Sequence, residues 1–203
     1  MTRPGASLPE LLLRAGTHSD VSDADAGVYR AALRALATAG TRKVTVDAIA
    51  AESGMSRMTL FRRFGSKDDI LAAALAWSLG RLFVQTAEVV ATTPDVAQRI
   101  EEVFVLCCRF GRTLFPDSSP EERAALFADE RLDLVGHGIR FVTAIMVQEQ
   151  ESGAVSEGGT EIRADALVRI TTACFAIEPA PFDLGDEEAA RAYARTALVP
   201  LAR

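Results

Sequence analysis

The stretch TVDAIAAESGMSRMTLFRRFGSK, residues 45–67, decides the fold of this 203-residue chain. It holds two short amphipathic segments separated by Gly54, and each begins at a hydroxyl side chain, Thr45 or Ser56, that suits a helix N-cap. Gly54 can adopt a left-handed turn without a Cβ penalty, and the small Ala50 lets the second helix approach the first closely. This spacing predicts a helix-turn-helix whose second helix enters a DNA major groove. The apolar residues expected between the two helices are Ile49, Met55 and Leu60.

The outer face of the second helix, residues 56–64, carries most of the predicted DNA contacts. Leu60 and Phe64 lie one turn apart and are expected to face inward, which leaves the other side chains outside. Arg57 can donate two hydrogen bonds to guanine or to a phosphate, and Met58 offers a methyl contact to thymine. For each single basic residue, a solvated surface position is the alternative. With the neighbouring helix starts, which suit phosphate, the predicted DNA-binding residues are Lys43, Thr45, Arg57, Met58, Thr59, Phe61, Arg62, Arg63 and Lys67.

Charge is distributed unevenly along the chain. Between Arg42 and Lys67, six Lys and Arg residues stand against two acidic residues, a local charge of +4. Residues 70–203 hold 12 Arg against 20 Asp and Glu, a charge of −8, and the whole chain carries −6. A basic island on an acidic body attracts phosphate at one face and repels it elsewhere. The pattern therefore favours binding to a defined DNA site over indiscriminate coating of nucleic acid.

The remainder of the chain has helical periodicity, with Gly and Pro at segment ends and no alternation typical of strands. We expect an all-α protein with a three-helix N-terminal helix-turn-helix domain in residues 21–69. A larger antiparallel helical domain for effector binding and dimerisation follows in residues 70–203, and residues 1–20 are expected to form a mobile arm. About nine helices are expected, beginning near Asp23, Val46, Arg57, Lys67, Pro94, Pro120, Gly136, Thr160 and Asp186, the first ended by Gly40 and the last near Pro200.

Composition excludes several classes of protein. The chain is 49% hydrophobic and 25% charged, and it is long enough to bury a core without disulfides or metals. It has no uncharged apolar run of about 18 residues that would predict a membrane span, and its three cysteines do not form a secreted disulfide framework. We therefore expect a cytoplasmic protein. Because the sequence has no phosphate-binding glycine loop, nucleophile elbow or metal constellation, we expect no enzymatic activity, cofactor or metal.

A helical domain that senses an effector needs a cavity, and such cavities are mostly apolar. Few charged residues interrupt the apolar stripes of this domain, which favours an apolar or neutral effector. Plain core packing is the alternative for every predicted cavity residue. The adjacent Cys107 and Cys108 could sense oxidation, but a helix directs them to different sides, so core packing is favoured. The predicted ligand-binding residues are Trp77, Phe104, Cys108, Phe141, Ile145 and Phe175.

The last two long helices, near residues 160–178 and 186–198, are rich in small side chains. Small residues let helices approach closely across a four-helix contact, so we expect these helices to join two chains about a two-fold axis. Packing within one chain is the alternative. A two-fold dimer requires an inverted-repeat operator in double-stranded DNA, with half-sites about one helical turn apart.

On residues 45–50, 54–57 and 59–67, the sequence resembles the tetracycline-repressor (TetR) family of bacterial regulators. The resemblance runs from about Val28 to Leu75, about a quarter of the chain. It implies a homodimer with a three-helix DNA-binding domain and a larger helical domain that binds a small effector and releases DNA.

Two positions depart from the pattern of this family. The family usually has tyrosine, whose hydroxyl often meets a phosphate, where this chain has Phe61, and it often has histidine where Arg63 stands. Our hypothesis is that Arg63 supplies the phosphate contact that Phe61 lacks.

The sequence thus predicts a sequence-specific transcriptional regulator, a repressor that a small effector releases from a palindromic operator. An activator fits the sequence equally well. The alternative from another class is a helical small-molecule-binding protein or enzyme with a vestigial helix-turn-helix. In that case, removing Arg57, Arg62 and Arg63 should matter little.

Overall fold

The computed structural model describes residues 21–114, 119–130, 132–151, 153, 158–176 and 182–202, without the side chains of residues 41 and 42. The expected mobile arm, residues 1–20, lies outside this description. The described residues form helices and no strand, which confirms the expected all-α fold. The elements are α2 (Asp23–Lys43), α3 (Val46–Ser53), α4 (Arg57–Phe64), α5 (Lys67–Thr92), α6 (Val96–Leu114), α7 (Pro120–Phe127), α8 (Leu134–Glu151), α9 (Thr160–Ala176), α10 (Glu187–Tyr193), the π-helical η1 (Ala194–Leu198) and α11 (Val199–Ala202).

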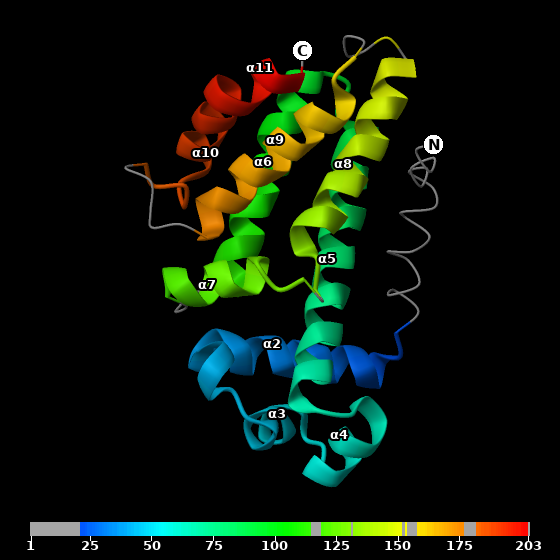
Figure 1. Cartoon of the computed structure of the whole chain (residues 1–203), viewed down its shortest axis with the longest axis vertical. Helices are drawn as coiled ribbons and strands as arrows, with labels where there is room; N and C mark the ends of the chain where they lie inside the picture. Colours follow the sequence, from blue (N-terminus) through cyan, green and yellow to red (C-terminus); the bar gives the residue numbers. More distant parts are fainter. Residues whose placement is uncertain are drawn as a thin grey trace.

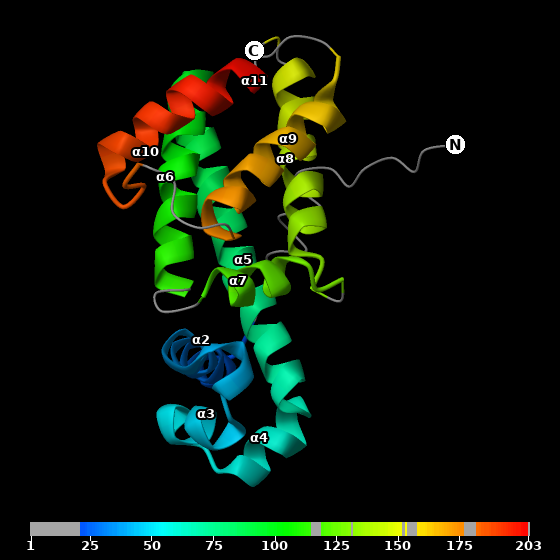
Figure 2. The same ribbon diagram turned by 60° about the vertical axis from the view of Figure 1, so that its left-hand side comes forward.

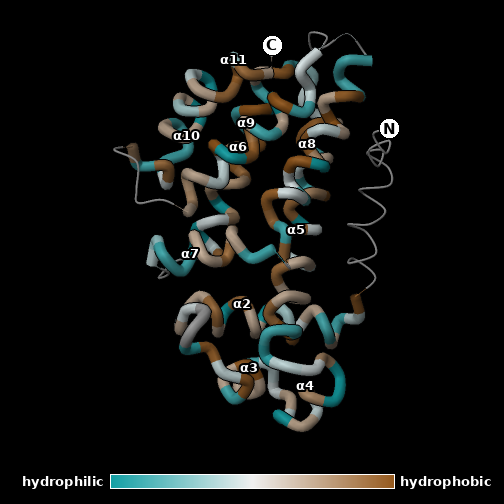
Figure 3. The backbone as a smooth tube through the Cα atoms, viewed as in Figure 1, coloured by the Kyte–Doolittle hydropathy of each residue, from teal (hydrophilic) through white to brown (hydrophobic). Residues whose placement is uncertain are grey.

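The long helix α5 connects two groups of helices. Helices α2, α3 and α4 pack around its beginning at the lower end of the molecule, and α6 to α11 surround its remainder (Figures 1 and 2). In Figure 3, hydrophobic and hydrophilic residues alternate along α5 and α6, as amphipathic helices require. Among the described helices, α5 is long and apolar enough by composition to cross a membrane. Its apolar side chains instead pack inside the protein. The first turns of α5 contribute to the core of the lower group, and the remainder contributes to the interior of the upper group.

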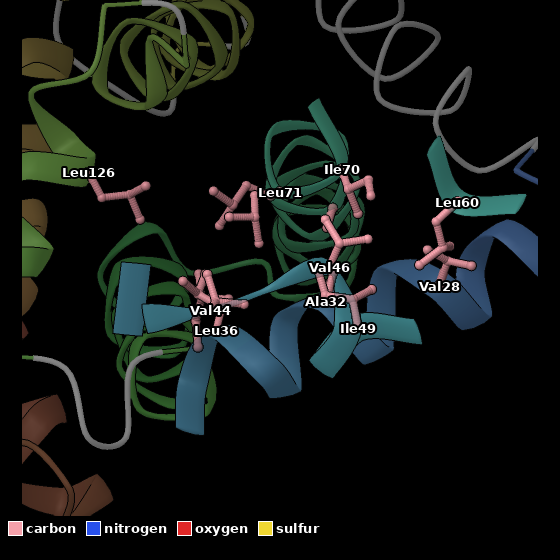
Figure 4. Packing of buried hydrophobic residues seen from close by; sticks show 13 residues of the cluster. Val28, Ala32, Leu36, Val44, Val46, Ile49, Leu60, Ile70, Leu71 and Leu126 are labelled. Carbon is pink, nitrogen blue, oxygen red and sulfur yellow. The ribbon is translucent and has the colours of Figure 1, made fainter. Parts of the chain in front are cut away.

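The core of the lower group holds one or more fully buried side chains from each of its helices. Val28 of α2, Ile49 of α3, Leu60 of α4 and Ile70 of α5 are each inaccessible to solvent and lie together in Figure 4. Burying each such side chain contributes about 1.5–3 kcal/mol relative to leaving it exposed. This packing fixes the angle between α3 and α4 and therefore the direction in which α4 faces.

Hydroxyl side chains cap the N-termini of α4 and of the helices next to it in the chain. Thr45, Ser56 and Ser66 each accept a hydrogen bond from the backbone N–H three residues ahead, as the sequence predicts. Ser119 does the same for α7 and forms a capping box with Glu122. Each cap contributes about 1 kcal/mol to helix stability.

Two helices of the upper group begin elsewhere than the sequence pattern indicates. Helix α6 begins at Val96 and not at Pro94, because the side chain of Asp95 takes the capping role and accepts from the N–H of Gln98 at 2.8 Å. Helix α8 begins at Leu134, two residues before Gly136, and Leu134 packs against the core that joins the two groups.

The last helix continues past its expected end near Pro200 and reaches Ala202. Proline normally ends a helix because it lacks an N–H and its ring clashes with the carbonyl four residues earlier. Here the five residues before α11 form the π-helical turn η1, in which Val199 donates to the carbonyl of Ala194. The wider π turn changes the bonding pattern at the point where proline would break an α-helix.

The two groups share one apolar cluster. Leu126 of α7 is buried with Leu36, Val44 and Leu71 of the lower group (Figure 4). Leu114 of α6 is buried in the same cluster. The division expected between residues 69 and 70 therefore falls inside α5 and inside a common core, and it stays a prediction about function.

Gly40 marks the point where α2 meets α7. Its φ of 73° and ψ of 168° break the helix there, as expected, and a Cβ at Gly40 would lie 2.5 Å from Oε1 of Glu122. This backbone region is open only to glycine. Gly27, in the second turn of the same helix, has no described atom within 4 Å of a Cβ position.

We expect Gly40→Ala to destabilise the protein by about 1–3 kcal/mol, because alanine is strained in this conformation. Gly27→Ala should stabilise it by about 0.5–1 kcal/mol, because it removes helix-interior glycine without a clash. Urea unfolding followed by the fluorescence of Trp77, the only tryptophan, measures both. Equal stabilities of the two variants would contradict this account of Gly40.

Candidate DNA-binding surface and effector cavity

The turn between α3 and α4 has the geometry that a helix-turn-helix requires. Gly54 adopts the left-handed conformation, with φ of 70° and ψ of 11°, and no described atom lies within 4 Å of its Cβ position. Ile49 and Leu60 are buried on either side of the turn, and Met55 and Ala50 pack against the same core. The second helix is thereby held with its opposite face outside the protein.

That outer face is formed by the exposed side chains of Arg57, Met58, Phe61 and Arg62. Met58 is 75% exposed, which leaves a large apolar side chain in water with no packing role inside the chain. Arg62 forms no ion pair with any described residue. An exposed apolar contact beside an unpaired guanidinium suits a surface that meets both thymine methyls and acceptors of DNA.

Arg57 is held above this face by two partners. Its Nη1 donates to both carboxylate oxygens of Asp47 at 3.0 and 3.2 Å, and its guanidinium carbon lies 5.4 Å from the centre of the Phe61 ring. Both members of the ion pair are well exposed, so the pair contributes little to stability. It orients the guanidinium while leaving it available to DNA.

Arg63 is directed away from this face toward the start of α2. Its Nε lies 2.7 Å from Oδ1 of Asp25 and its Nη2 donates to Oδ2 at 2.8 Å, with Ser22 nearby at 3.3 Å. The guanidinium also lies 5.7 Å from the centre of the Phe64 ring. In this position Arg63 joins α4 to α2, and a phosphate would have to compete with Asp25 for it. The hypothesis that Arg63 replaces the missing tyrosine hydroxyl stays untested.

The other predicted DNA contacts surround α4. Lys43 and Thr45 are exposed just before α3, where the Thr45 hydroxyl accepts from the N–H of Ala48 at 3.1 Å. Thr59 is half-buried, and its hydroxyl lies 2.9 Å from that of Ser56. Lys67 begins α5, with its Nζ 3.8 Å from Asp68.

A cavity of about 150 Å³, here called the first chamber, lies among α5, α6, α7, α8 and α9. The rings of Phe83 and Phe141 stack beside each other with centroids 4.3 Å apart. The polar groups on its wall are the hydroxyls of Thr86, Thr171 and Thr172, together with the Cys107 thiol. A dry cavity of about this size accommodates benzene.

A second chamber of about 120 Å³ lies among α5, α6, α8, α9 and the C-terminal helix. At its wall Arg99 of α6 forms an ion pair with Glu149 of α8. The two chambers are neighbours, because both are lined by Thr86, Val103, Cys107, Val142, Leu167 and Thr171.

Cys107 contributes an apolar wall and not a reactive thiol. Burial raises the pKa of Cys107 to about 12 and the pKa of Cys108 to about 11. Both thiols therefore stay protonated near neutral pH, and a protonated thiol is a poor nucleophile.

The structure distributes the six predicted ligand-binding residues over three environments. Phe141 and Phe175 line the first chamber, and Phe104 and Ile145 line the second. Trp77 and Cys108 line neither: the Trp77 ring packs 5.9 Å from that of Tyr29, and Cys108 is buried against α10 and η1.

The sequence reasoning missed the polar residues of the chambers. Thr171 and Thr172 belong to a helix whose small side chains predict close helix contact, whereas both line the first chamber. Arg99 and Glu149 are 50 positions apart and gave no local signal, since charged residues are ordinarily found at the surface. Among the described residues, no group of three or more His, Cys, Asp or Glu is placed to hold a metal.

Helix α5 contributes to both sites. Its first residues, Ile70 and Leu71, pack in the core beneath α4, and residues from Leu75 to Val90 line the two chambers. A single rigid element therefore runs from the outward-facing helix-turn-helix to an internal cavity. This arrangement defines the class of protein: a DNA-binding transcriptional regulator with a ligand-sized cavity.

Comparison with known proteins shows a family resemblance in the DNA-binding unit and a similar fold over most of the chain. Residues 28–74 match the model of the bacterial regulatory proteins of the tetR family. The fold is similar to that of GusR from Salmonella enterica, with 18% identity, a TM-score of 0.63 and coverage of 88% of this chain and 95% of that one. It is also similar to FadR from Bacillus subtilis in complex with stearoyl-CoA, with 16% identity, a TM-score of 0.63 and coverage of 87% and 97%. A comparison with curated proteins gives no match. Residues 28–74 thus carry the sequence pattern of the bacterial regulatory proteins of the tetR family.

We expect Arg62→Ala to weaken binding to every DNA sequence and to reduce the slope of log K against log salt by about one, because one phosphate contact is lost. Arg109→Ala, on the exposed side of α6, removes the same charge far from α4 and is the control. Salt titrations followed by fluorescence anisotropy measure both slopes. An unchanged slope for Arg62→Ala would show that this side chain does not meet phosphate.

Proposed function

We propose that the protein is a dimeric repressor that binds an inverted-repeat operator and leaves it when a small apolar effector occupies the chambers. The observation that supports this most directly is the continuity of α5. This helix packs beneath the outer face of α4 and also lines both chambers. A molecule that fills the chambers therefore contacts the helix on which the DNA-binding unit rests.

The repressor acts through differential binding. An effector favours the conformer with misplaced recognition helices only if it binds that conformer more tightly. A difference of a few kcal/mol between the two conformers changes operator occupancy strongly. A further contact between the two groups of helices lies at α7, where Phe127 lines the first chamber and the adjacent Leu126 is buried in the shared core. A ligand that fills the first chamber would therefore touch the residues of α5 and of α7 that contact the lower group.

The chemistry of the effector follows from the chamber walls. Nearly all lining side chains are aliphatic or aromatic, so burial of apolar surface would drive binding. The similar structure of FadR from Bacillus subtilis is a complex with stearoyl-CoA, a molecule with a long apolar chain. This supports an apolar chain as the part of the effector that enters the protein.

The proposed dimer contact lies on α8 and α9. Ile162 of α9 is 77% exposed and Val147 of α8 is 43% exposed, and they lie at the joined ends of this antiparallel pair. The last helix is less available than the sequence suggests, because its small residues Ala190 and Ala194 are buried against α6 within the chain. A two-fold contact through α9 would place two copies of α4 on one side of a DNA duplex.

The operator experiment uses DNA that flanks the gene of the protein itself, labelled for fluorescence anisotropy, with a scrambled duplex as competitor. We expect tight binding that survives the competitor, at two protomers per site, and loss of preference when Arg57 and Met58 are both replaced by alanine. Equal and steeply salt-dependent binding to both duplexes would instead favour a small-molecule-binding protein with a vestigial helix-turn-helix.

We expect Ile162→Asp to weaken self-association and, with it, operator binding, because it places a charge in a proposed apolar contact. Sedimentation equilibrium at micromolar protein measures the association. Phe182→Asp, an equally non-conservative change at an exposed residue before α10, should leave it unchanged. A wild-type protein that is monomeric at this concentration would contradict the dimer.

A further inference from the structure

The wall of the second chamber carries one charged pair in apolar surroundings. The side chains of Arg99 and Glu149 are only 17% and 15% exposed, and most other lining residues are aliphatic. Taking two charges out of water is costly, and replacing such a pair by apolar residues is often neutral or stabilising. A contribution to stability therefore explains poorly why this ion pair lies at a cavity wall. Recognition of a ligand explains its position directly.

The guanidinium of Arg99 is fixed by three acceptors. Its Nε donates to the carbonyl of Thr93, its Nη2 to the carbonyl of Pro94 at 3.2 Å, and its Nη1 to Glu149. Arginine has five N–H donors, so two of them have no partner among the described residues. A ligand oxygen that reaches the second chamber can accept from these two donors without displacing Glu149.

We propose that the effector is an uncharged amphiphile, with an apolar chain in the two chambers and a neutral acceptor group, such as a hydroxyl, ketone or ester, on Arg99 beside Glu149. This inference rests on the proposed function and specifies the head group that the chambers select.

The charge of the pair explains why the head group is neutral. Arg99 and Glu149 together carry no net charge, and among the described residues no other ionised side chain lines either chamber. A carboxylate on Arg99 would be repelled by Glu149 at nearly the same distance and would lose its hydration. An ammonium group beside Glu149 would be repelled by Arg99 in the same way. A neutral acceptor loses the least hydration and still finds a strong donor.

The shape of the chambers explains the chain. The α5 residues that line them run from Leu75 to Val90, and 15 helical steps of 1.5 Å correspond to roughly 22 Å of continuous wall. Each chamber is close in size to a cavity that accommodates benzene, so the two together suit a chain of roughly ten to twelve carbons.

The test compares three ligands that share one chain and differ in charge: dodecanol, dodecanoate and dodecylamine, each below its aggregation concentration. Isothermal titration of the wild-type dimer should give a Kd for dodecanol on the order of tenfold below those of the other two. Glu149→Gln keeps the shape but leaves the charge of Arg99 uncompensated. This variant should therefore bind dodecanoate more tightly than dodecanol, reversing the order.

Glu101→Gln is the matched control, because Glu101 is 12% exposed, pairs with Arg195 and lines neither chamber. It should retain the wild-type order. Wild-type protein that binds dodecanoate as tightly as dodecanol, or binds none of the three, overturns the proposal even if Glu149→Gln fails to fold. Operator binding is measured on the same samples. If it persists when the ligand order is wrong, the head-group inference fails alone, and if it is absent, the proposed function fails too.

Discussion

The burial of the first turns of α5 against α2, α3 and α4 is the contact on which the rest of the structure depends. Ile70 is inaccessible to solvent in the same cluster as Val28, Ile49 and Leu60. Without this contact the short helices α3 and α4, eight residues each, would be unstable, since isolated helices of that length do not persist in water. The same contact sets the direction of the outer face of α4 and makes α5 part of both the DNA-binding surface and the interior of the other helices.

A rigid connection of this kind gives regulation a simple physical basis. Protein interiors are close-packed and hardly compressible. A ligand that fills an apolar cavity is therefore accommodated by small shifts of whole helices and not by compression of neighbouring side chains. Helix α5, Leu114 of α6, Phe127 of α7 and Leu134 of α8 each line the first chamber and also pack in or against the core that the two groups share. In the proposed mechanism, a bound effector would act on the DNA-binding helices through these residues.

The basic residues of the DNA-binding unit do not play one common role. Arg57 is oriented over the exposed face by Asp47 and Phe61, Arg62 has no ion-pair partner among the described residues, and Arg63 is turned toward Asp25. Their spacing in the sequence predicts helix positions but not these partners, because Asp25 and Asp47 come from other helices. An electrostatic map drawn from charge counts alone would overestimate the number of guanidinium groups on the outer face of α4.

The sequence by itself determined the all-helical fold, the helix-turn-helix, its caps and the outward positions of Arg57, Met58 and Arg62 on α4, because these follow from local propensity and from apolar spacing within one helix. Only the tertiary structure decided which apolar residues line a cavity and which fill a core. Phe104 and Phe141 border the chambers, whereas Trp77 and Cys108 lie outside them, although all four are buried residues in apolar stripes. The pairing of Arg99 with Glu149 and the passage of the last helix through Pro200 also depend on the tertiary fold. They arise from contacts between distant helices and from a π turn, and neither leaves a periodic signal in the chain.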